Sequence, residues 1–251
     1  MLMVIDVGNT NLVFGLYDGD ALRAKFRLST DAARTADEIG LHIAAFFRHF
    51  ELPLSSVDDA VIGSVVPQVM YPLTHALQKY LDLRPRVVGE DIDLGLVNLC
   101  QEPLGADRAL TGLGAMARFG APLIVVDFGT ATKVDAFNAE RAYLGGVICP
   151  GIKISMEALF ARAAKLPRVE IRKPRSVIGV NTVEQMQAGA VYGFVGGVTH
   201  IVEHTRRAMG DPNVPVVATG GLASLIAEYA DCIDHTERNL TLEGLKLAAQ
   251  R

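Results

Sequence analysis

The pattern of apolar and polar residues predicts two groups of strands, one in each half of the chain. Within each group the residues either alternate apolar and polar or run apolar, and turn residues such as Asp18-Gly19-Asp20 separate neighbouring runs. This pattern is typical of an antiparallel meander. The six predicted strands are residues 2–8, 11–17, 22–28, 122–128, 131–137 and 142–148. The second half therefore repeats the plan of the first.

Helices with apolar residues at helical spacing follow each group of strands. The first helix begins at a predicted capping box, Thr35 to Glu38, and Thr182 is expected to cap a long helix with Gln185 completing the box. Further helices are predicted at 68–82, 105–119, 154–163 and 182–209, after Ala223 and from Thr241, with buried strands at 59–66, 86–88 and 214–219. This order predicts an α/β protein with mixed sheets covered by helices.

One short segment occurs twice, at the end of the first strand of each group. It reads Val4-Ile5-Asp6-Val7-Gly8-Asn9-Thr10-Asn11 and then Val125-Val126-Asp127-Phe128-Gly129-Thr130-Ala131-Thr132. A β-branched run that stops at Asp and Gly predicts a strand entering a tight turn. Glycine allows a bound group to approach the backbone, amide and hydroxyl donors suit phosphate oxygens, and an ionised Asp suits a cation. One copy alone is equally typical of a hairpin turn, whereas two copies predict two lobes that face each other across a nucleotide.

Two more segments are candidates for chemistry. In Gly105-Ala106-Asp107-Arg108, the carboxylate either offsets the dipole at a helix start or accepts a proton from a substrate hydroxyl, and the guanidinium suits an anionic group. Gly220-Gly221 follows a buried strand and either admits a ring or phosphate or allows tight packing. The residues themselves leave both alternatives open.

Composition excludes several classes of protein. The chain has 251 residues, half of them hydrophobic, and a net charge of −4, so nucleic acid and anionic membranes are poor candidates for its main partner. Cys100, Cys149 and Cys232 are scattered, as expected of reduced thiols in a cytoplasmic protein without a zinc site. The chain start has no signal-peptide pattern and no apolar run is long enough to cross a membrane. A P-loop signature is absent, so any ATP site is of another type.

Taken together, these segments resemble the type III pantothenate kinases, the CoaX-type enzymes of bacterial coenzyme A synthesis, within the acetate kinase–sugar kinase–Hsp70–actin superfamily. The resemblance extends over nearly the whole chain. The other segments that carry it are Leu144-Gly145-Gly146, Pro150-Gly151-Ile152, Ala164-Lys165-Leu166-Pro167, Asn181-Thr182-Val183-Glu184, Ala218-Thr219-Gly220-Gly221-Leu222-Ala223 and Leu240-Thr241-Leu242-Glu243-Gly244. It implies duplicated ribonuclease H-like (actin-like ATPase) lobes, residues 1–117 and 118–251, with a nucleotide cleft between them.

The resemblance also implies an activity, the ATP-dependent phosphorylation of pantothenate as the first step of coenzyme A biosynthesis. Asp107 would be the general base, Mg²⁺ would accompany ATP, and Asp127 would hold a monovalent cation, potassium or ammonium. The implied pantothenate-binding residues are Asn98, Gly105, Ala106, Asp107, Arg108 and Thr182. The implied ATP-binding residues are Asp6, Val7, Gly8, Asn9, Thr10, Asn11, Leu12, Val13 and Thr130. The family forms homodimers.

The chain departs from the family pattern at two places. Asn98 stands where the family usually has a substrate-contacting tyrosine, and Lys133 stands where it usually has threonine. A lysine close to the phosphates either replaces some of the cation's charge or disturbs the site, so we expect an altered dependence on monovalent cations. These departures leave open a regulatory, non-catalytic member of the family. A kinase acting on another small hydroxyl compound is a further alternative.

Overall fold

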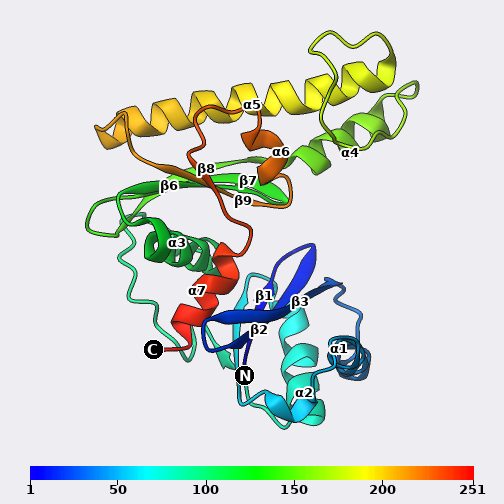
Figure 1. Ribbon diagram of the computed structural model, residues 1–251, viewed down its shortest axis with the longest axis vertical. Coiled ribbons are helices and arrows are strands. Elements are labelled where there is room, and N and C mark those ends of the chain that lie inside the picture. The colour runs from blue at the N-terminus through cyan, green and yellow to red at the C-terminus, as the bar shows by residue number, and fades with distance from the viewer. The chain divides into compact units, whose positions relative to one another are not determined.

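The computed structural model describes residues 1–251 and contains two five-stranded mixed sheets (Figure 1). Its strands are β1 (Leu2–Val7), β2 (Asn11–Asp18), β3 (Ala21–Ser29), β4 (Asp59–Ser64), β5 (Arg86–Val87), β6 (Leu123–Phe128), β7 (Ala131–Phe137), β8 (Tyr143–Pro150), β9 (Val216–Gly220) and β10 (His235–Thr236). Its α-helices are α1 (Ala36–His49), α2 (Met70–Leu81), α3 (Ala106–Phe119), α4 (Ile152–Arg162), α5 (Thr182–Met209), α6 (Ala223–Ala227) and α7 (Leu240–Ala248). Two 3-10 turns, η1 (Leu54–Ser56) and η2 (Pro67–Val69), complete the order.

The two sheets have the same topology, which confirms the repeated plan. The first has the order β3-β2-β1-β4-β5, and the second has the matching order β8-β7-β6-β9-β10. In each sheet, the first strand pairs antiparallel with the second strand, β1 with β2 and β6 with β7. The first strand also pairs parallel with a later strand that follows helices in the chain, β1 with β4 and β6 with β9. Only β10 among the strands had no predicted counterpart, because its two residues are polar and exposed and so give no apolar pattern.

Contacts between residues group the chain into two compact units that are not continuous in sequence. Unit 1 contains Met1–Leu96, Glu102–Gly114 and Leu240–Arg251, whereas unit 2 contains Val97–Gln101 and Ala115–Asn239. The last helix, α7, belongs to unit 1 because it packs on β1 and β4. The division into lobes 1–117 and 118–251 therefore remains a prediction, drawn from the repeated sequence. The two units defined by contacts have other boundaries.

In unit 1 both faces of the sheet are covered by helices. Met3 and Ile5 of β1 pack on α1 and α2, whereas Val4, with the opposite orientation, packs on α3 and α7. The predicted capping box of α1 is confirmed, since Thr35 and Glu38 bond each other's backbone. Asp37 of α1 accepts hydrogen bonds from two side chains of α2, Lys79 at 2.7 Å and Tyr80 at 2.8 Å.

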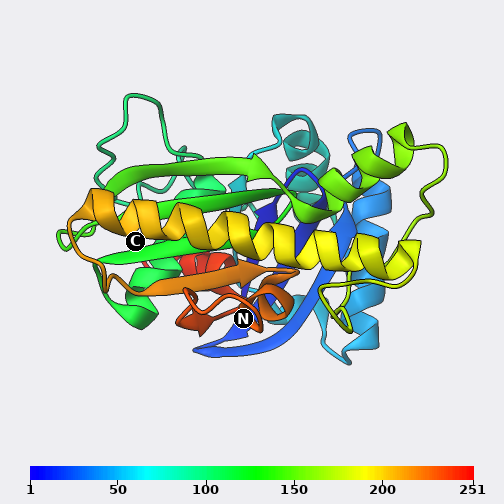
Figure 2. The same ribbon diagram turned by 90° about the horizontal axis from the view of Figure 1, so that it is seen from above.

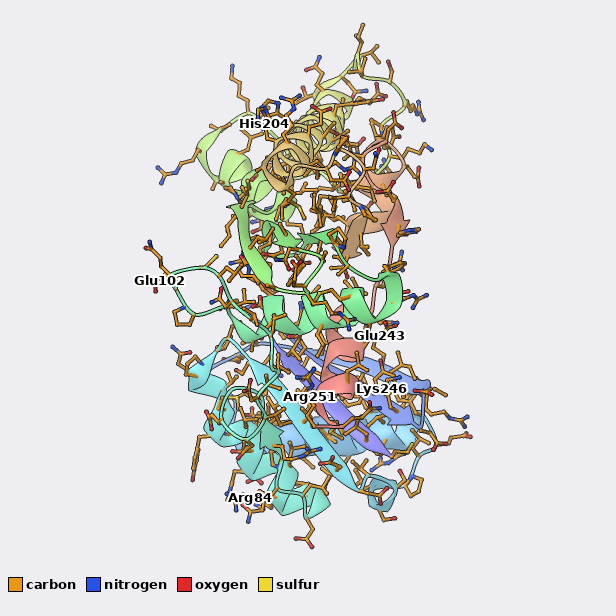
Figure 3. The ribbon with its side chains drawn as sticks, turned by 90° about the vertical axis from the view of Figure 1, so that its left-hand side faces the viewer. Arg84, Glu102, His204, Glu243, Lys246 and Arg251 are labelled. Atoms are coloured by element: carbon orange, nitrogen blue, oxygen red, sulfur yellow. The ribbon has the colours of Figure 1, made fainter.

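The helices α3 and α7 approach each other unusually closely within unit 1. A Cβ atom at Gly114 would collide with the Leu240 carbonyl, and one at Gly244 would collide with the Leu110 carbonyl. Two further contacts hold α7 and the chain end that follows it, through Lys246 of the helix and the terminal Arg251, both labelled in Figure 3. Lys246 pairs with Asp20 at 2.7 Å, and Arg251 donates to the Leu94 carbonyl. Glycine is required at 114 and 244 because the backbones touch there.

In unit 2 the 28-residue helix α5 runs along one face of the sheet (Figure 2). Val191 and Val198 of this helix share a core with Ile124 and Val126 of β6. The cap of α5 corrects the sequence prediction. Asn181, not Thr182, is the N-cap, because its side-chain oxygen accepts from the Glu184 amide at 3.0 Å. Both residues are favourable caps, Asn more so than Thr, and the preference for Thr182 rested on pairing it with Gln185.

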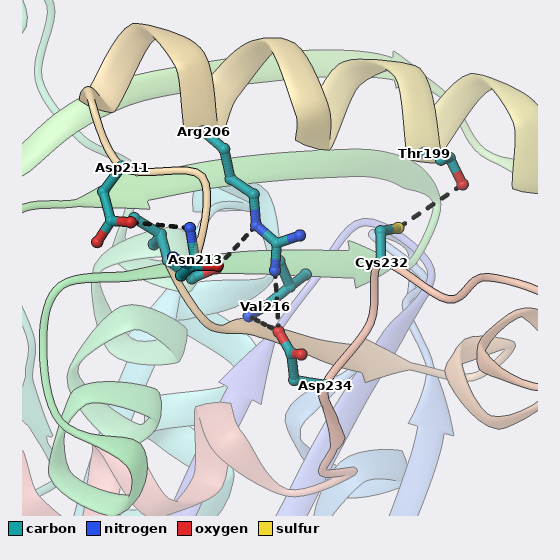
Figure 4. A network of polar contacts seen from close by, with 8 residues as sticks. Thr199, Arg206, Asp211, Asn213, Val216, Cys232 and Asp234 are labelled. Carbon is teal, nitrogen blue, oxygen red and sulfur yellow. Dashed lines mark hydrogen bonds and ion pairs between the residues drawn. The ribbon is translucent and has the colours of Figure 1, made fainter.

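A polar network fixes the C-terminal end of α5 to β9 (Figure 4). Arg206 donates to the Val214 carbonyl at 2.9 Å and to Asp234 at 3.1 Å, and Asp234 also accepts from the Val216 amide at 2.8 Å.

Cys232 lies nearby, and burial raises the pKa of its thiol. All three cysteines are free thiols. None of the helices is both long and apolar enough to span a membrane.

Candidate active site

The first Asp-x-Gly segment forms the predicted tight turn in unit 1. We call residues 6–11 the first corner. The Gly8 amide donates to the Asn11 carbonyl at 3.0 Å, directly after the last residue pair of β1 and β2, Val7 with Leu12. Thr30, just beyond β3, supports the corner, because its hydroxyl donates to the Gly8 carbonyl at 2.6 Å.

The start of α3 lies beside the strand ends that lead into the first corner. The Val65 amide, just after β4, donates to the Val7 carbonyl at 3.1 Å. A Cβ atom built on Gly105 would lie 3.9 Å from the Val65 side chain. Unit 1 therefore contains two predicted site segments, residues 6–13 and Gly105–Arg108, and the second begins beside the strand ends that lead into the first corner.

Asp107 occupies the first turn of α3, and its surroundings hold the carboxylate in place. Its Oδ1 accepts from the Arg108 amide at 2.8 Å. A Cβ atom at Gly105 would lie only 2.9 Å from the same oxygen, so glycine at 105 leaves room for this carboxylate. The positive end of the helix dipole favours a negative group at this position.

A pair of threonines that no sequence pattern assigns to the site anchors this turn. Thr111 donates to the Asp107 carbonyl at 2.7 Å, and its hydroxyl lies 2.8 Å from that of Thr241 in α7. Thr241 was predicted to open the last helix, and the helix does begin beside it, at Leu240. No local pattern links residues 111 and 241, so only the tertiary structure reveals their contact.

The second Asp-x-Gly segment forms the corresponding turn in unit 2, which we call the second corner, residues 127–132. The Gly129 amide donates to the Ala131 carbonyl at 3.2 Å, and the last residue pair is Phe128 with Thr132. Asp127 stands directly opposite Lys133 in the ladder. The Asp127 Oδ2 and Lys133 Nζ atoms lie 3.0 Å apart, and the two side chains are only 21% and 16% exposed.

Glycines from two other elements pack tightly against the second corner. A Cβ atom at Gly220 would lie 2.6 Å from the Phe128 carbonyl and 2.7 Å from Asp127 Oδ1, and Gly220 has a φ of +94°. One at Gly151 would lie 2.7 Å from the Gly129 carbonyl. The packing alternative for Gly220 therefore has direct structural support, since a side chain there is excluded by both contact and conformation.

The glycines within the two corners behave differently. A Cβ atom at Gly8 or Gly129 would meet no atom closer than 3.4 Å, and neither residue has a positive φ. The protein's own packing and backbone conformation thus do not require glycine at these two positions. A bound group that approaches the backbone closely would require it, so both corners fit a phosphate ligand.

The carboxylate at Asp127 does not fit a free monovalent cation as well as the resemblance implied. The Lys133 ammonium already contacts it, so a further cation at this carboxylate would meet a like charge. Separately, residues 1–251 contain no group of three or more His, Cys, Asp or Glu side chains able to hold a metal ion. Magnesium that arrives with ATP needs no such group, because it keeps several waters and binds through one or two carboxylates together with phosphate oxygens.

The remaining predicted site residues lie in unit 2. The Asn98 side-chain oxygen accepts from the Cys100 amide at 2.9 Å, and backbone bonds join residues 97 and 99 to Tyr143. The amide oxygen of Asn98 therefore stabilises a local turn. Thr182 is the first residue of α5 and is exposed, and Thr130 lies at the exposed tip of the second corner.

Comparisons with known proteins identify the family. The model of the family described as type III pantothenate kinase matches residues 2–204. A type III pantothenate kinase from Exiguobacterium is 47% identical over 253 residues, which cover 100% of this chain and 99% of the relative.

Solved structures of lower identity show the fold alone. A candidate 2-dehydro-3-deoxygalactonokinase from Sinorhizobium meliloti has a TM-score of 0.63 at 14% identity, covering 100% of this chain and 96% of that one. An archaeal actin homolog has a TM-score of 0.55 at 13% identity, covering 100% and 99%. These likenesses confirm the predicted actin-like fold with its duplicated plan. With the family model matched over most of its length, the chain belongs to the type III pantothenate kinase family.

Proposed function

We propose that the chain is a kinase that transfers the terminal phosphoryl group of ATP to the primary hydroxyl of pantothenate. This reaction is the first step of coenzyme A biosynthesis. Membership of the family supports the reaction. The observation that carries the assignment to residues is the Asp107 carboxylate, which lies in the same unit as the first corner and beside the strand ends that lead into it.

The corner residues have a role that suits phosphoryl transfer. This reaction needs alignment and charge neutralisation more than covalent help from the protein. Backbone amides and small polar side chains bind phosphate oxygens, and Mg²⁺ that accompanies ATP neutralises their charge. We assign ATP binding to Asp6, Val7, Gly8, Asn9, Thr10, Asn11, Leu12, Val13 and Thr130.

Asp107 and Arg108 are assigned to pantothenate. The Asp107 carboxylate accepts the proton of the attacking hydroxyl, and in a loose transition state this proton leaves late, so a weak base is sufficient. The Arg108 guanidinium suits the carboxylate of pantothenate. Gly105 and Ala106 complete this segment, and Asn98 and Thr182 are proposed as further pantothenate contacts.

Replacement of Asp107 tests the proposal. In Asp107→Asn we expect turnover of pantothenate to fall by about 10²- to 10⁴-fold, because the base is lost while the shape is kept. Nucleotide binding, measured by calorimetry without pantothenate, should be retained. Release of ADP in a coupled assay gives the turnover. Asp82→Asn is the matched control, since Asp82 is exposed at a left-handed helix end where Asn is equally favourable.

Full turnover by Asp107→Asn would remove this residue from the base role. A wild-type protein that phosphorylates another hydroxyl compound in a substrate panel, but not pantothenate, would support the alternative kinase. ATP binding without any turnover would support the regulatory alternative. Each result is distinct from the others.

We also propose that the protein is located in the cytoplasm and that two copies associate as a homodimer. Exposed apolar side chains at Val177, Ile178 and Val180, just before α5, are consistent with association of two copies. Sedimentation of the purified protein measures its mass. A single 26.9-kDa species at micromolar concentration would contradict the homodimer.

A further inference from the structure

The second corner holds a positive charge that belongs to the protein itself. Lys133 Nζ lies 3.0 Å from Asp127 Oδ2, and the strand register fixes the two residues opposite each other. The Lys133 side chain is only 16% exposed, so most of the side chain is shielded from bulk solvent. An ion pair in such surroundings is screened by salt much less than an exposed pair.

A buried carboxylate lies on the same face of β7. Side chains two residues apart on a strand point to the same side of the sheet, so Lys133 and Asp135 share a face. Asp135 is 3% exposed and accepts a hydrogen bond from the Tyr143 hydroxyl at 3.2 Å. A cation at position 133 therefore faces a region with two acidic side chains, Asp127 and Asp135.

The first corner shows that the fold does not require this lysine. Asp6 occupies the place of Asp127 on the first strand of its sheet, and its partner across the ladder is Val13. The same topology thus accepts an apolar residue opposite the corner aspartate. Position 13, which corresponds to Lys133 in the first corner, therefore carries an uncharged side chain.

We infer that the ammonium group of Lys133 serves as the fixed monovalent cation of the second corner, so that this kinase works without added potassium or ammonium. The inference rests on the proposed function. It replaces the expectation that Asp127 binds a free cation, because the structure already places a cation of the protein against that carboxylate. The lysine side chain ends in a primary ammonium, the chemical relative of the ammonium ion.

The experiment compares the wild type with Lys133→Thr in potassium chloride and in choline chloride at equal ionic strength, with magnesium and ATP present. We expect equal wild-type turnover in the two salts. In choline, Lys133→Thr should lose about tenfold or more, the size of a lost charge-assisted contact, and potassium should restore most of it. Lys173→Thr is the matched control, because Lys173 forms an exposed ion pair with Glu228 in the same unit and is 69% exposed.

Binding of ADP gives a second readout that needs no turnover. Affinity measured by calorimetry should be independent of potassium in the wild type and should gain a potassium dependence in Lys133→Thr. Lys133→Arg keeps the charge and should keep the independence. If Lys133→Thr does not fold, as judged by its thermal transition, the wild type and Lys133→Arg still decide the question.

Wild-type turnover or ADP affinity that rises steeply with potassium would overturn the inference and leave the kinase assignment intact. Indifference of Lys133→Thr to potassium would also overturn it. If no variant phosphorylates pantothenate in either salt, the proposed function fails, and the ADP measurements still test the role of Lys133. The two proposals can therefore fail separately.

Discussion

The two corners have the same place in the same fold, yet they differ in length, charge and packing. The first corner has four residues, 8–11, between its last paired residues, whereas the second has three, 129–131. Val13 faces Asp6, but Lys133 faces Asp127. The two corners therefore share the position of their aspartates and differ in the residue that faces each aspartate.

The corners are also supported by different means. A hydroxyl of Thr30 holds the first corner, whereas the backbone contacts of Gly220 and Gly151 hold the second. In the first case the support is one hydrogen bond that a substitution can remove. In the second case it is close packing of backbone atoms, which tolerates no added side chain.

The largest expected effect on this comparison comes from Gly220→Ala. The added methyl group meets the Phe128 carbonyl at 2.6 Å and forces a φ of +94° on alanine. We expect a loss of about 3 kcal/mol in the free energy of unfolding of unit 2. Urea denaturation followed by circular dichroism measures it. Gly129→Ala is the control in the same corner, since its methyl group has room, and equal stability of the two variants would contradict the packing argument.

A smaller effect, on ligand binding and not on folding, is expected for Gly8→Ala. The methyl group meets nothing closer than 3.4 Å, so stability should change little. If ATP phosphates lie against this backbone, affinity for ATP should fall by about tenfold to a hundredfold, because the methyl group displaces them. Calorimetry measures the affinity. Unchanged affinity would show that no phosphate approaches Gly8, and would leave the first corner as an ordinary turn.

The smallest expected effect is the pH dependence of the α1–α2 contact in unit 1. Hydrogen bonds from Lys79 and Tyr80 lower the pKa of Asp37 below its usual value of 3.8. The stabilisation of the folded state by these hydrogen bonds is therefore present above pH 3.8 and is lost as the pH falls through the lowered pKa of Asp37. The melting temperature of Asp37→Asn should be slightly lower than that of the wild type near neutral pH. This difference in melting temperature should disappear as the pH falls below 3.8. Asp82→Asn serves as the control, and a gap that widens in acid would contradict the assignment.

Local sequence patterns predicted most of the elements because the relevant signals are local. Alternation of apolar residues located the meanders, and the Thr35 and Glu38 pair located the start of α1. The same approach assigned the cap of α5 to Thr182 in place of Asn181, because adjacent cap residues look alike in sequence. It missed β10, which is defined by its pairing with β9 and not by its two residues.

The sequence by itself determined the repeated strands, the two aspartate-glycine corners and the family to which the chain belongs, because these depend on residues adjacent along the chain. Only the tertiary structure decided that α7 packs with unit 1, that Gly105 makes room for Asp107, and that Lys133 meets Asp127. These contacts depend on strand register and helix packing, which join residues by their distance in space.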